Sequence, residues 1–228
     1  PSMKNSNSNV NITNKNENLK EDFEDVQVDV EQDSVVRVPS TPDRTGFELT
    51  AWYDNALCEG EAFNFASPIT ASIDLYAKWE VLADSVKYLD ENGSSKEAKI
   101  PYSNKIDASY TFNGNSLESG WYVVNGKLTV RDRITITGDV NLILTDKCDI
   151  TFENGIQLMS GNTLSVYSQT DSQSQMGKLT AYGRGDHDAA IGTGGNGTAG
   201  TLNVVGGNIT AIADQGAGVG GGKGPVST

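Results

Sequence analysis

The sequence predicts a mainly β protein made of two different units, a small strand-dominated domain followed by a parallel β-helix. Three observations carry this prediction. Apolar residues alternate with polar ones in short runs, which is the period of a half-buried strand. Only four of the 25 glycines precede residue 120, so the second half is glycine-rich. The short strands of that half recur as similar phrases without any helical signal, as in stacked turns.

The negative net charge argues against two classes of binding partner. The chain has 17 Lys and Arg against 30 Asp and Glu, a net charge of −13. Nucleic acids and anionic membranes are bound through Lys and Arg, so we expect neither as a partner. No run of about 18 apolar residues is present, so we expect no membrane insertion within this chain. The two cysteines, Cys58 and Cys148, fall in different predicted units and are expected to be isolated thiols.

Residues 8–80 form the predicted first unit, and residues 1–7 are expected to be a disordered or engineered end. An apolar group from Val35 to Val38 ends at Pro39. Pro39 and Pro42 favour an extended connector after it. Most of the net negative charge belongs to this unit, because residues 1–80 hold 6 basic and 15 acidic side chains, a net charge of 6 − 15 = −9 out of −13. Period-two alternation predicts its strands over residues 9–13, 26–30, 46–53 and 73–79.

An ordered series of motifs runs through the end of this unit: Pro39-x-x-Pro42, Gly46-Phe47, Trp52-Tyr53-Asp54, Cys58, Phe63-x-Phe65, Pro68-Ile69-Thr70 and Leu75-Tyr76-Ala77-Lys78-Trp79. The series resembles the Listeria–Bacteroides repeat, also called the internalin B-repeat. The resemblance implies a β-grasp-like fold. It also implies a spacer module of the kind found in bacterial surface and secreted proteins.

Four aromatic residues of the first unit have two interpretations. Trp52, Tyr53, Tyr76 and Trp79 lie in predicted strands, and the resemblance implies that these are scaffold positions. Large aromatics dominate small cores, so we expect a structural role in packing. The alternative is a platform on which sugar rings stack.

Residues 81–133 are predicted to form the N-terminal cap of the β-helix. Two Asn-Gly pairs, at Asn92 and Asn125, favour tight turns, because this pair readily takes positive φ values. The first pair predicts a hairpin between residues 86–90 and 96–100. The second pair predicts another hairpin, between residues 121–124 and 127–130.

Residues 134–228 are predicted to form turns of a right-handed parallel β-helix, with three short strands per turn. Each turn buries its inward residues on its neighbours, so the ends need caps. No cap follows the last turn, and we expect a β-helix truncated at its C-terminus, which would allow end-to-end self-association. The repeat aligns Leu164 with Leu202, Leu179 with Ile209 and Ile191 with Val219. The phrases at residues 120–126, 138–144, 189–192 and 206–211 resemble the glycine-rich β-helical region of large bacterial surface proteins.

Catalysis is one hypothesis, because parallel β-helices include pectate lyases and polygalacturonases. Their sites need clustered carboxylates, with basic residues for the uronate or calcium for the acid. The candidates here are Asp186, His187 and Asp188, but the separate Asp pairs and later basic motifs of polygalacturonases are missing. We therefore expect no enzyme activity and no cofactor. Asp186 and Asp188 are the candidate ligands if calcium binds.

Carbohydrate binding is the other functional hypothesis for the β-helix. Tyr167 and Tyr182 follow inward-facing residues, so both are expected to point outward, where they and His187 could contact a glycan. The two tyrosines come from different strands of one turn.

Together these patterns predict a non-enzymatic fragment of an exported bacterial protein, located at the cell surface or outside the cell. The first unit would be a spacer, and the β-helix a stalk and adhesive surface. The expected partners are glycans or surface proteins of host or neighbouring cells. The alternatives are a polysaccharide-binding module on the β-helix and, after it, a uronate lyase or glycoside hydrolase.

Overall fold

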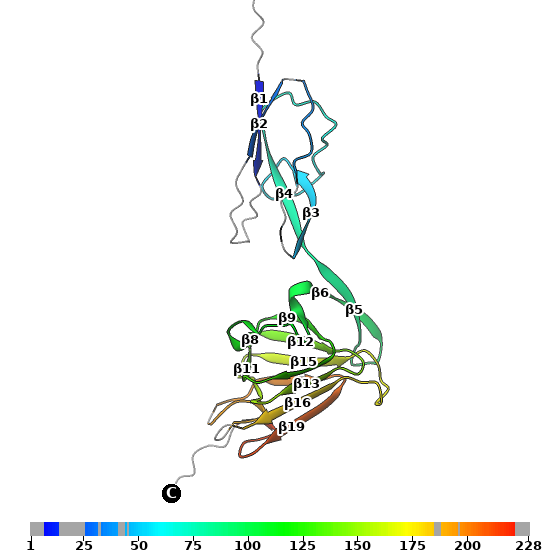
Figure 1. The fold of residues 1–228 in the computed structure, drawn as a ribbon, viewed down its shortest axis with the longest axis vertical. Helices are drawn as coiled ribbons and strands as arrows, with labels where there is room; N and C mark the ends of the chain where they lie inside the picture. The colour runs from blue at the N-terminus through cyan, green and yellow to red at the C-terminus, as the bar shows by residue number, and fades with distance from the viewer. Residues whose placement is uncertain are drawn as a thin grey trace, which may run out of the picture. The chain divides into compact units, whose positions relative to one another are not determined.

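A computed structural model describes residues 7–13, 26–31, 33–40, 44, 46–184, 188–195 and 197–221 (Figure 1). The chain divides into two compact units, Pro1–Leu82 and Ala83–Thr228. The described residues are almost entirely strand and turn, with two short 3₁₀ helices. No helix in the described ranges is long and apolar enough to cross a membrane.

The N-terminal unit is a mixed sheet of four strands in the order β2-β1-β4-β3. β1 and β4 are parallel, whereas the β1–β2 and β3–β4 pairs are antiparallel. The expected apolar segment at residues 35–38 is not a strand, and only Val36 in it is buried. The four strands are β1 (Asn7–Thr13), β2 (Val26–Glu31), β3 (Phe47–Tyr53) and β4 (Ile73–Val81).

The core of this unit lies against β3 and β4. Alternate residues of β4, from Leu75 to Trp79, are buried, as the period-two pattern predicts. The Arg44 guanidinium lies 4.4 Å from the centre of the Phe47 ring and 5.3 Å from that of Trp79, a cation–π arrangement that closes the core. The buried members are Val36, Trp52, Ile69, Leu75, Ala77 and Trp79.

The C-terminal unit begins with an antiparallel hairpin, β5 (Ala83–Leu89) and β6 (Ser95–Pro101). This confirms the hairpin predicted around Asn92. Its turn uses Gly93 at a φ of 75°, and the Asp90 carboxylate accepts hydrogen bonds from the backbone amides of Asn92 and Ser94.

Three parallel sheets follow, and the chain visits them in rotation. Sheet I is β7-β9-β12-β15-β18, sheet II is β10-β13-β16-β19, and sheet III is β8-β11-β14-β17-β20. In Figure 1 β9, β12 and β15 lie one below the other, as do β13, β16 and β19. The strands are β7 (Lys105–Ile106), β8 (Ser116–Leu117), β9 (Gly120–Val124), β10 (Lys127–Val130), β11 (Ile134–Ile136), β12 (Asp139–Leu144), β13 (Asp149–Phe152), β14 (Ile156–Gln157), β15 (Thr163–Ser168), β16 (Lys178–Gly183), β17 (Ile191–Gly192), β18 (Thr201–Val204), β19 (Asn208–Ala213) and β20 (Val219–Gly220).

The predicted repeat alignment is confirmed residue by residue. Leu164 pairs with Leu202, Leu179 with Ile209, and Ile191 with Val219. In sheet II every strand carries an apolar residue, a threonine and another apolar residue, and the threonines lie in register: Thr129, Thr151, Thr180 and Thr210. The apolar neighbours of these threonines therefore stack in the interior, where each fully buried large side chain contributes roughly 1.5–3 kcal/mol.

The second predicted hairpin is wrong. β9 and β10 do not pair with each other, because β9 lies in sheet I beside β12 and β10 lies in sheet II beside β13. Gly126 does take the positive φ that the Asn-Gly pair favours, 77°, but it turns a corner between two sheets. The Asn125 amide donates to the Ile106 carbonyl, and the Asp149 amide donates to the Gly126 carbonyl. These bonds to the turns on either side replace those of a hairpin.

The first turn lacks a strand in sheet II. Between β7 and β8 the chain runs through residues 107–115, which include the 3₁₀ helix η2 (Asn113–Asn115). Tyr110 and Phe112 from this segment pack against the interior, and the Phe112 ring lies 6.4 Å from that of Phe152. The segment therefore covers one end of the apolar core in place of a strand.

Candidate functional site

Tyr167 lies in an aromatic cluster under the β5–β6 hairpin. Its ring centre is 4.9 Å from that of Tyr88 and 5.2 Å from that of Trp121, and the last two are 4.8 Å apart. Its hydroxyl donates to the Asn141 side-chain carbonyl at 3.4 Å. Tyr167 is thus on the outer side of sheet I, but the hairpin packs on it and leaves it half-buried.

Tyr182 is on sheet II, so the structure does not bring the two tyrosines together. Its ring is half-buried, with the Arg184 guanidinium 5.0 Å from the ring centre. Its neighbour in register is Ile212, which is 46% exposed. This part of sheet II thus offers an aromatic ring with the Arg184 guanidinium over its face. The third candidate, His187, lies outside the described residues.

Asp188 contacts Arg133, which comes from the corner after β10. The Arg133 guanidinium lies 3.8 Å from the Asp188 carboxylate. It also donates to the backbone carbonyls of Asn154, Ala189 and Gly192 at 3.0–3.2 Å. Burial lowers the pKa of Arg133, and the charge of Asp188 opposes that shift. Asp188 is therefore part of a structural link between successive corners.

The calcium hypothesis rests on Asp186 and Asp188, of which the structure describes only Asp188. The described residues contain no group of three His, Cys, Asp or Glu side chains that could hold a metal ion. Asp188 is engaged with Arg133, and its predicted companion, Asp186, is outside the described ranges.

The four aromatic residues of the N-terminal unit lie in or beside its core. Trp52, Tyr53 and Trp79 are buried, and Tyr76 is half-buried. The Lys78 ammonium lies 5.3 Å from the centre of the Tyr53 ring. Because the indoles are buried in the core, they offer no open platform on which a sugar could stack.

A polar groove of about 570 Å³ lies beside β5. It is lined by Asp84, Glu97, Lys105, Asn125, Asp146 and Gln169, among others. Asp84 forms an ion pair with Lys105, and the hydrogen bond from Lys105 is the main cause that lowers the pKa of Asp84. Gln169 donates from its side chain to the Lys87 carbonyl at 3.1 Å, which ties the groove wall to the hairpin.

Sequence reasoning missed this groove. Its residues come from β5, β6, β7, β9 and from three corners that are far apart in the chain. No local motif marks them, since only the packing of the hairpin beside sheet I brings them together. The one signal in the sequence was the hairpin itself.

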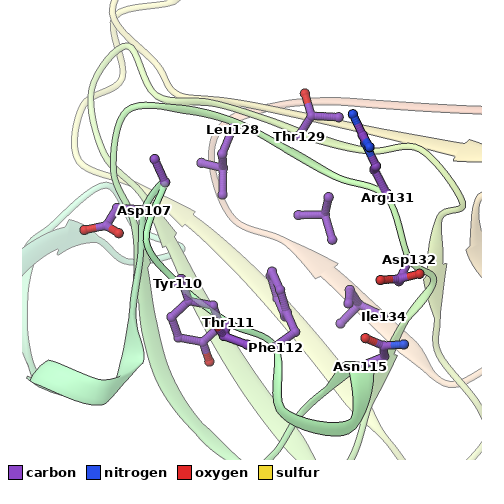
Figure 2. Close-up of a pocket in the computed structure, with 12 residues that line it drawn as sticks. Asp107, Tyr110, Thr111, Phe112, Asn115, Leu128, Thr129, Arg131, Asp132 and Ile134 are labelled. Carbon is purple, nitrogen blue, oxygen red and sulfur yellow. The ribbon is translucent and has the colours of Figure 1, made fainter.

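A second pocket, of about 310 Å³, opens beside β10 (Figure 2). Tyr110 and Phe112 form one wall, with ring centres 4.9 Å apart, and Leu128 and Thr129 of β10 form the other. Asp107 and Asp132 lie at opposite sides of the opening in Figure 2. Burial raises the pKa of Tyr110 to about 12. The pocket therefore combines an apolar floor with charged ends.

Residues 11–78 match the Listeria-Bacteroides repeat domain, which confirms the resemblance and lies within the predicted unit of residues 8–80. A protein of Evansella cellulosilytica, provisionally named a membrane protein, is 30% identical over 144 residues, covering 61% of this chain and 21% of that protein. A second protein of this organism, provisionally named a Gly-rich membrane protein, is 32% identical over 75 residues, covering 32% of this chain and 8% of that protein.

The chain thus spans about a fifth or less of the curated relatives that it matches. No solved structure gives a significant match. The family match covers only residues of the N-terminal unit.

Proposed function

We propose that this chain is part of an exported bacterial cell-surface protein in which it acts as a spacer and stalk. The N-terminal repeat domain is the spacer, and the C-terminal unit is the stalk with an adhesive outer surface. The names of the two Evansella relatives support a location at the membrane or surface. The observation that carries the stalk role is the continuous in-register pairing of all three parallel sheets.

The fold behind this proposal is a right-handed parallel β-helix. Rotation of the chain through sheets I, II and III, with three strands per turn, supports it. A stack of this kind propagates side-chain packing from one turn to the next, so it resists bending and suits a stalk. The order β2-β1-β4-β3 of the N-terminal sheet supports a β-grasp-like spacer.

Surface exposure is tested on intact cells of the producing bacterium. An antibody raised against the purified chain should label cells without permeabilisation, and brief protease treatment of intact cells should remove the label. A cytoplasmic protein serves as the control that the protease must spare. Labelling that appears only after permeabilisation would contradict the proposal.

Contact with another molecule through the last described turn is part of the proposed role. Val204, Ile212 and Val219 in this turn are between 46% and 53% exposed, which is unusual for large apolar residues of a stack. End-to-end self-association through this turn predicts a sedimentation coefficient that rises with protein concentration. Replacement of Val204 and Ile212 by Ser should abolish the rise, and a concentration-independent monomer would exclude self-association.

Polysaccharide binding is the second candidate function, and the polar groove beside β5 favours it. Carboxylates, an ammonium group and side-chain amides line the groove, and this mixture of donors and acceptors suits sugar hydroxyls. A glycan array with the full chain tests it. Specific binding that is lost in Asp146→Ala and Gln169→Ala, and retained in Tyr182→Ala, would assign the groove. Loss in Tyr182→Ala alone would assign the outer face of sheet II.

The proposal includes no catalytic step. The absence of the polygalacturonase motifs supports this, as does the engagement of Asp188 with Arg133. Incubation of the chain with polygalacturonate, with and without calcium, should release neither reducing ends nor unsaturated uronates. Product formation that Asp188→Asn abolishes would revive the enzyme hypothesis.

A further inference from the structure

β10 is the edge strand of sheet II, and its free side faces the 310 Å³ pocket. The Gly126 and Val130 carbonyls accept hydrogen bonds from the amides of Asp149 and Glu153 in the next turn. Backbone groups in a strand alternate from side to side, so those of Lys127 and Thr129 point to the free side. Within the described residues, no strand pairs with β10 there.

The other two sheets do have a strand in the first turn. β7 extends sheet I beyond β9, and β8 extends sheet III beyond β11. In sheet II the corresponding segment, residues 107–115, bows away from β10, and the pocket fills the space between them. Among the described residues, sheet II therefore has no strand at the position that β7 fills in sheet I and β8 fills in sheet III.

We propose that the edge of β10 binds an extended peptide of a partner protein as an additional parallel strand of sheet II. Such a peptide accepts a hydrogen bond from the Thr129 amide and donates to the carbonyls of Lys127 and Thr129. Alternate apolar side chains of the peptide enter the pocket between the Tyr110 and Phe112 rings and Leu128 (Figure 2).

The chemistry of the pocket selects the peptide. Every strand of sheet II has an apolar residue on either side of a threonine, so the same pattern fits the missing position. Two of the three charged residues at the pocket are the carboxylates of Asp107 and Asp132, which favour a lysine or arginine at either end of the peptide. A second intact copy of the stack is disfavoured, because Asn104 bonds to the Trp121 carbonyl and, with β7, already covers the same end of sheet I.

The test uses the full chain and a fluorescent peptide, Gly-Lys-Leu-Thr-Val-Lys-Gly, which copies Lys127–Val130 and adds flanking residues. Fluorescence anisotropy should show saturable binding. Thr129→Pro removes one amide of the free edge while keeping the groups that bond β13, so affinity should fall about tenfold or more. The matched control is Ala213→Pro, which places a proline on the free edge of β19 in the same sheet, and it should bind as the parent does.

Two N-methylated peptides make the test independent of protein folding. The proposed hydrogen bonds place the threonine of the peptide opposite Thr129. In this register the Leu and Val amides of the peptide donate to β10, whereas its Thr amide points away. Methylation of the Leu and Val amides should abolish binding, and methylation of the Thr amide should change affinity by less than about threefold. Absence of saturable binding would overturn the proposal, as would an unchanged affinity in Thr129→Pro or equal effects of the two methylated peptides.

Discussion

The guanidinium of Arg133 lies 3.8 Å from the carboxylate of Asp188, although the two residues belong to different turns of the C-terminal unit. The same guanidinium donates to the carbonyls of Asn154 and Ala189, at the two following corners, and to that of Gly192 in β17. One side chain thereby bonds acceptors from successive turns. This link explains why a half-buried arginine is tolerated so close to the core.

Removing this link should destabilise the stack. Arg133→Ala leaves the part-buried Ala189 carbonyl and Asp188 without this donor, while the Gly192 carbonyl keeps its bond from the Leu158 amide, so we expect the free energy of unfolding to fall by about 2–3 kcal/mol. Urea denaturation followed by circular dichroism measures it. Arg131→Ala, at an exposed position in the same corner, is the matched control and should change stability by less than about 0.5 kcal/mol. Equal effects of the two substitutions would contradict the assignment.

The β5–β6 hairpin should be held on sheet I by the aromatic cluster. Tyr88→Ala and Tyr167→Ala are each expected to lower stability by about 2 kcal/mol, because each leaves a gap between packed rings. The double variant should show a coupling energy of about 1 kcal/mol, since the rings contact each other. Tyr182→Ala, on the other sheet, should show no coupling to Tyr88→Ala. Additive effects of Tyr88→Ala and Tyr167→Ala would mean that the hairpin is not anchored there.

Two glycines with positive φ separate the cost of strain from the cost of a clash. A Cβ at Gly192, where φ is 144°, would collide with the Gly220 carbonyl of the next turn. Gly192→Ala should therefore cost about 3 kcal/mol or more. Gly126→Ala has an open space around the new Cβ and should cost only about 1–2 kcal/mol from its backbone conformation. Thermal unfolding compares the two, and a smaller effect at Gly192 would argue against close stacking of β17 on β20.

The thiols should differ in reactivity. Cys148 is buried, and burial raises its pKa to about 11, so little thiolate forms in the native protein. Burial also raises the pKa of Cys58, while Lys78 opposes that shift. At about pH 8 we expect Ellman's reagent to modify Cys58 slowly and Cys148 only after unfolding in urea. Rapid modification of native Cys58→Ser would show that Cys148 is accessible.

Tyr110 should make stability fall at alkaline pH. Its pKa is raised from 10.0 to about 12 because burial disfavours the phenolate. The neutral side chain therefore stabilises the fold fully below pH 10, and this contribution is lost as pH rises through the folded pKa of about 12. Spectrophotometric titration of the native protein should show a late phenolate step that Tyr110→Phe removes. If the late step persists in Tyr110→Phe, the buried phenol is another tyrosine.

The sequence anticipated the interior better than the outer surface. Inward residues such as Leu164 and Leu202 were aligned from their phrases alone, because stacking imposes the same residue type at the same place in each turn. The motifs from Pro39 to Trp79 identified the repeat domain. The outward tyrosines carried no such constraint, so their surroundings could not be derived from periodicity.

The Asn-Gly pairs at Asn92 and Asn125 separate what a local pattern predicts from what it does not. Both gave the positive φ that their chemistry favours, at Gly93 and at Gly126. Only the first closed a hairpin. At the second pair the chain turns a corner between two sheets. There β9 and β10 each pair in parallel with a strand about 20 residues later and not with each other. A local conformation was predictable, whereas the choice between competing partners depended on distant segments.

The sequence by itself determined the β character, the division into two units, the repeat domain and the register of the last two turns, since these follow from local period and recurrence. Only the tertiary structure decided which segments pack on the outside of the three parallel sheets. The hairpin covers Tyr167, Arg133 links three corners, and residues 107–115 leave the edge of β10 open. These features arise from contacts between segments that share no pattern, so only the folded chain could place them.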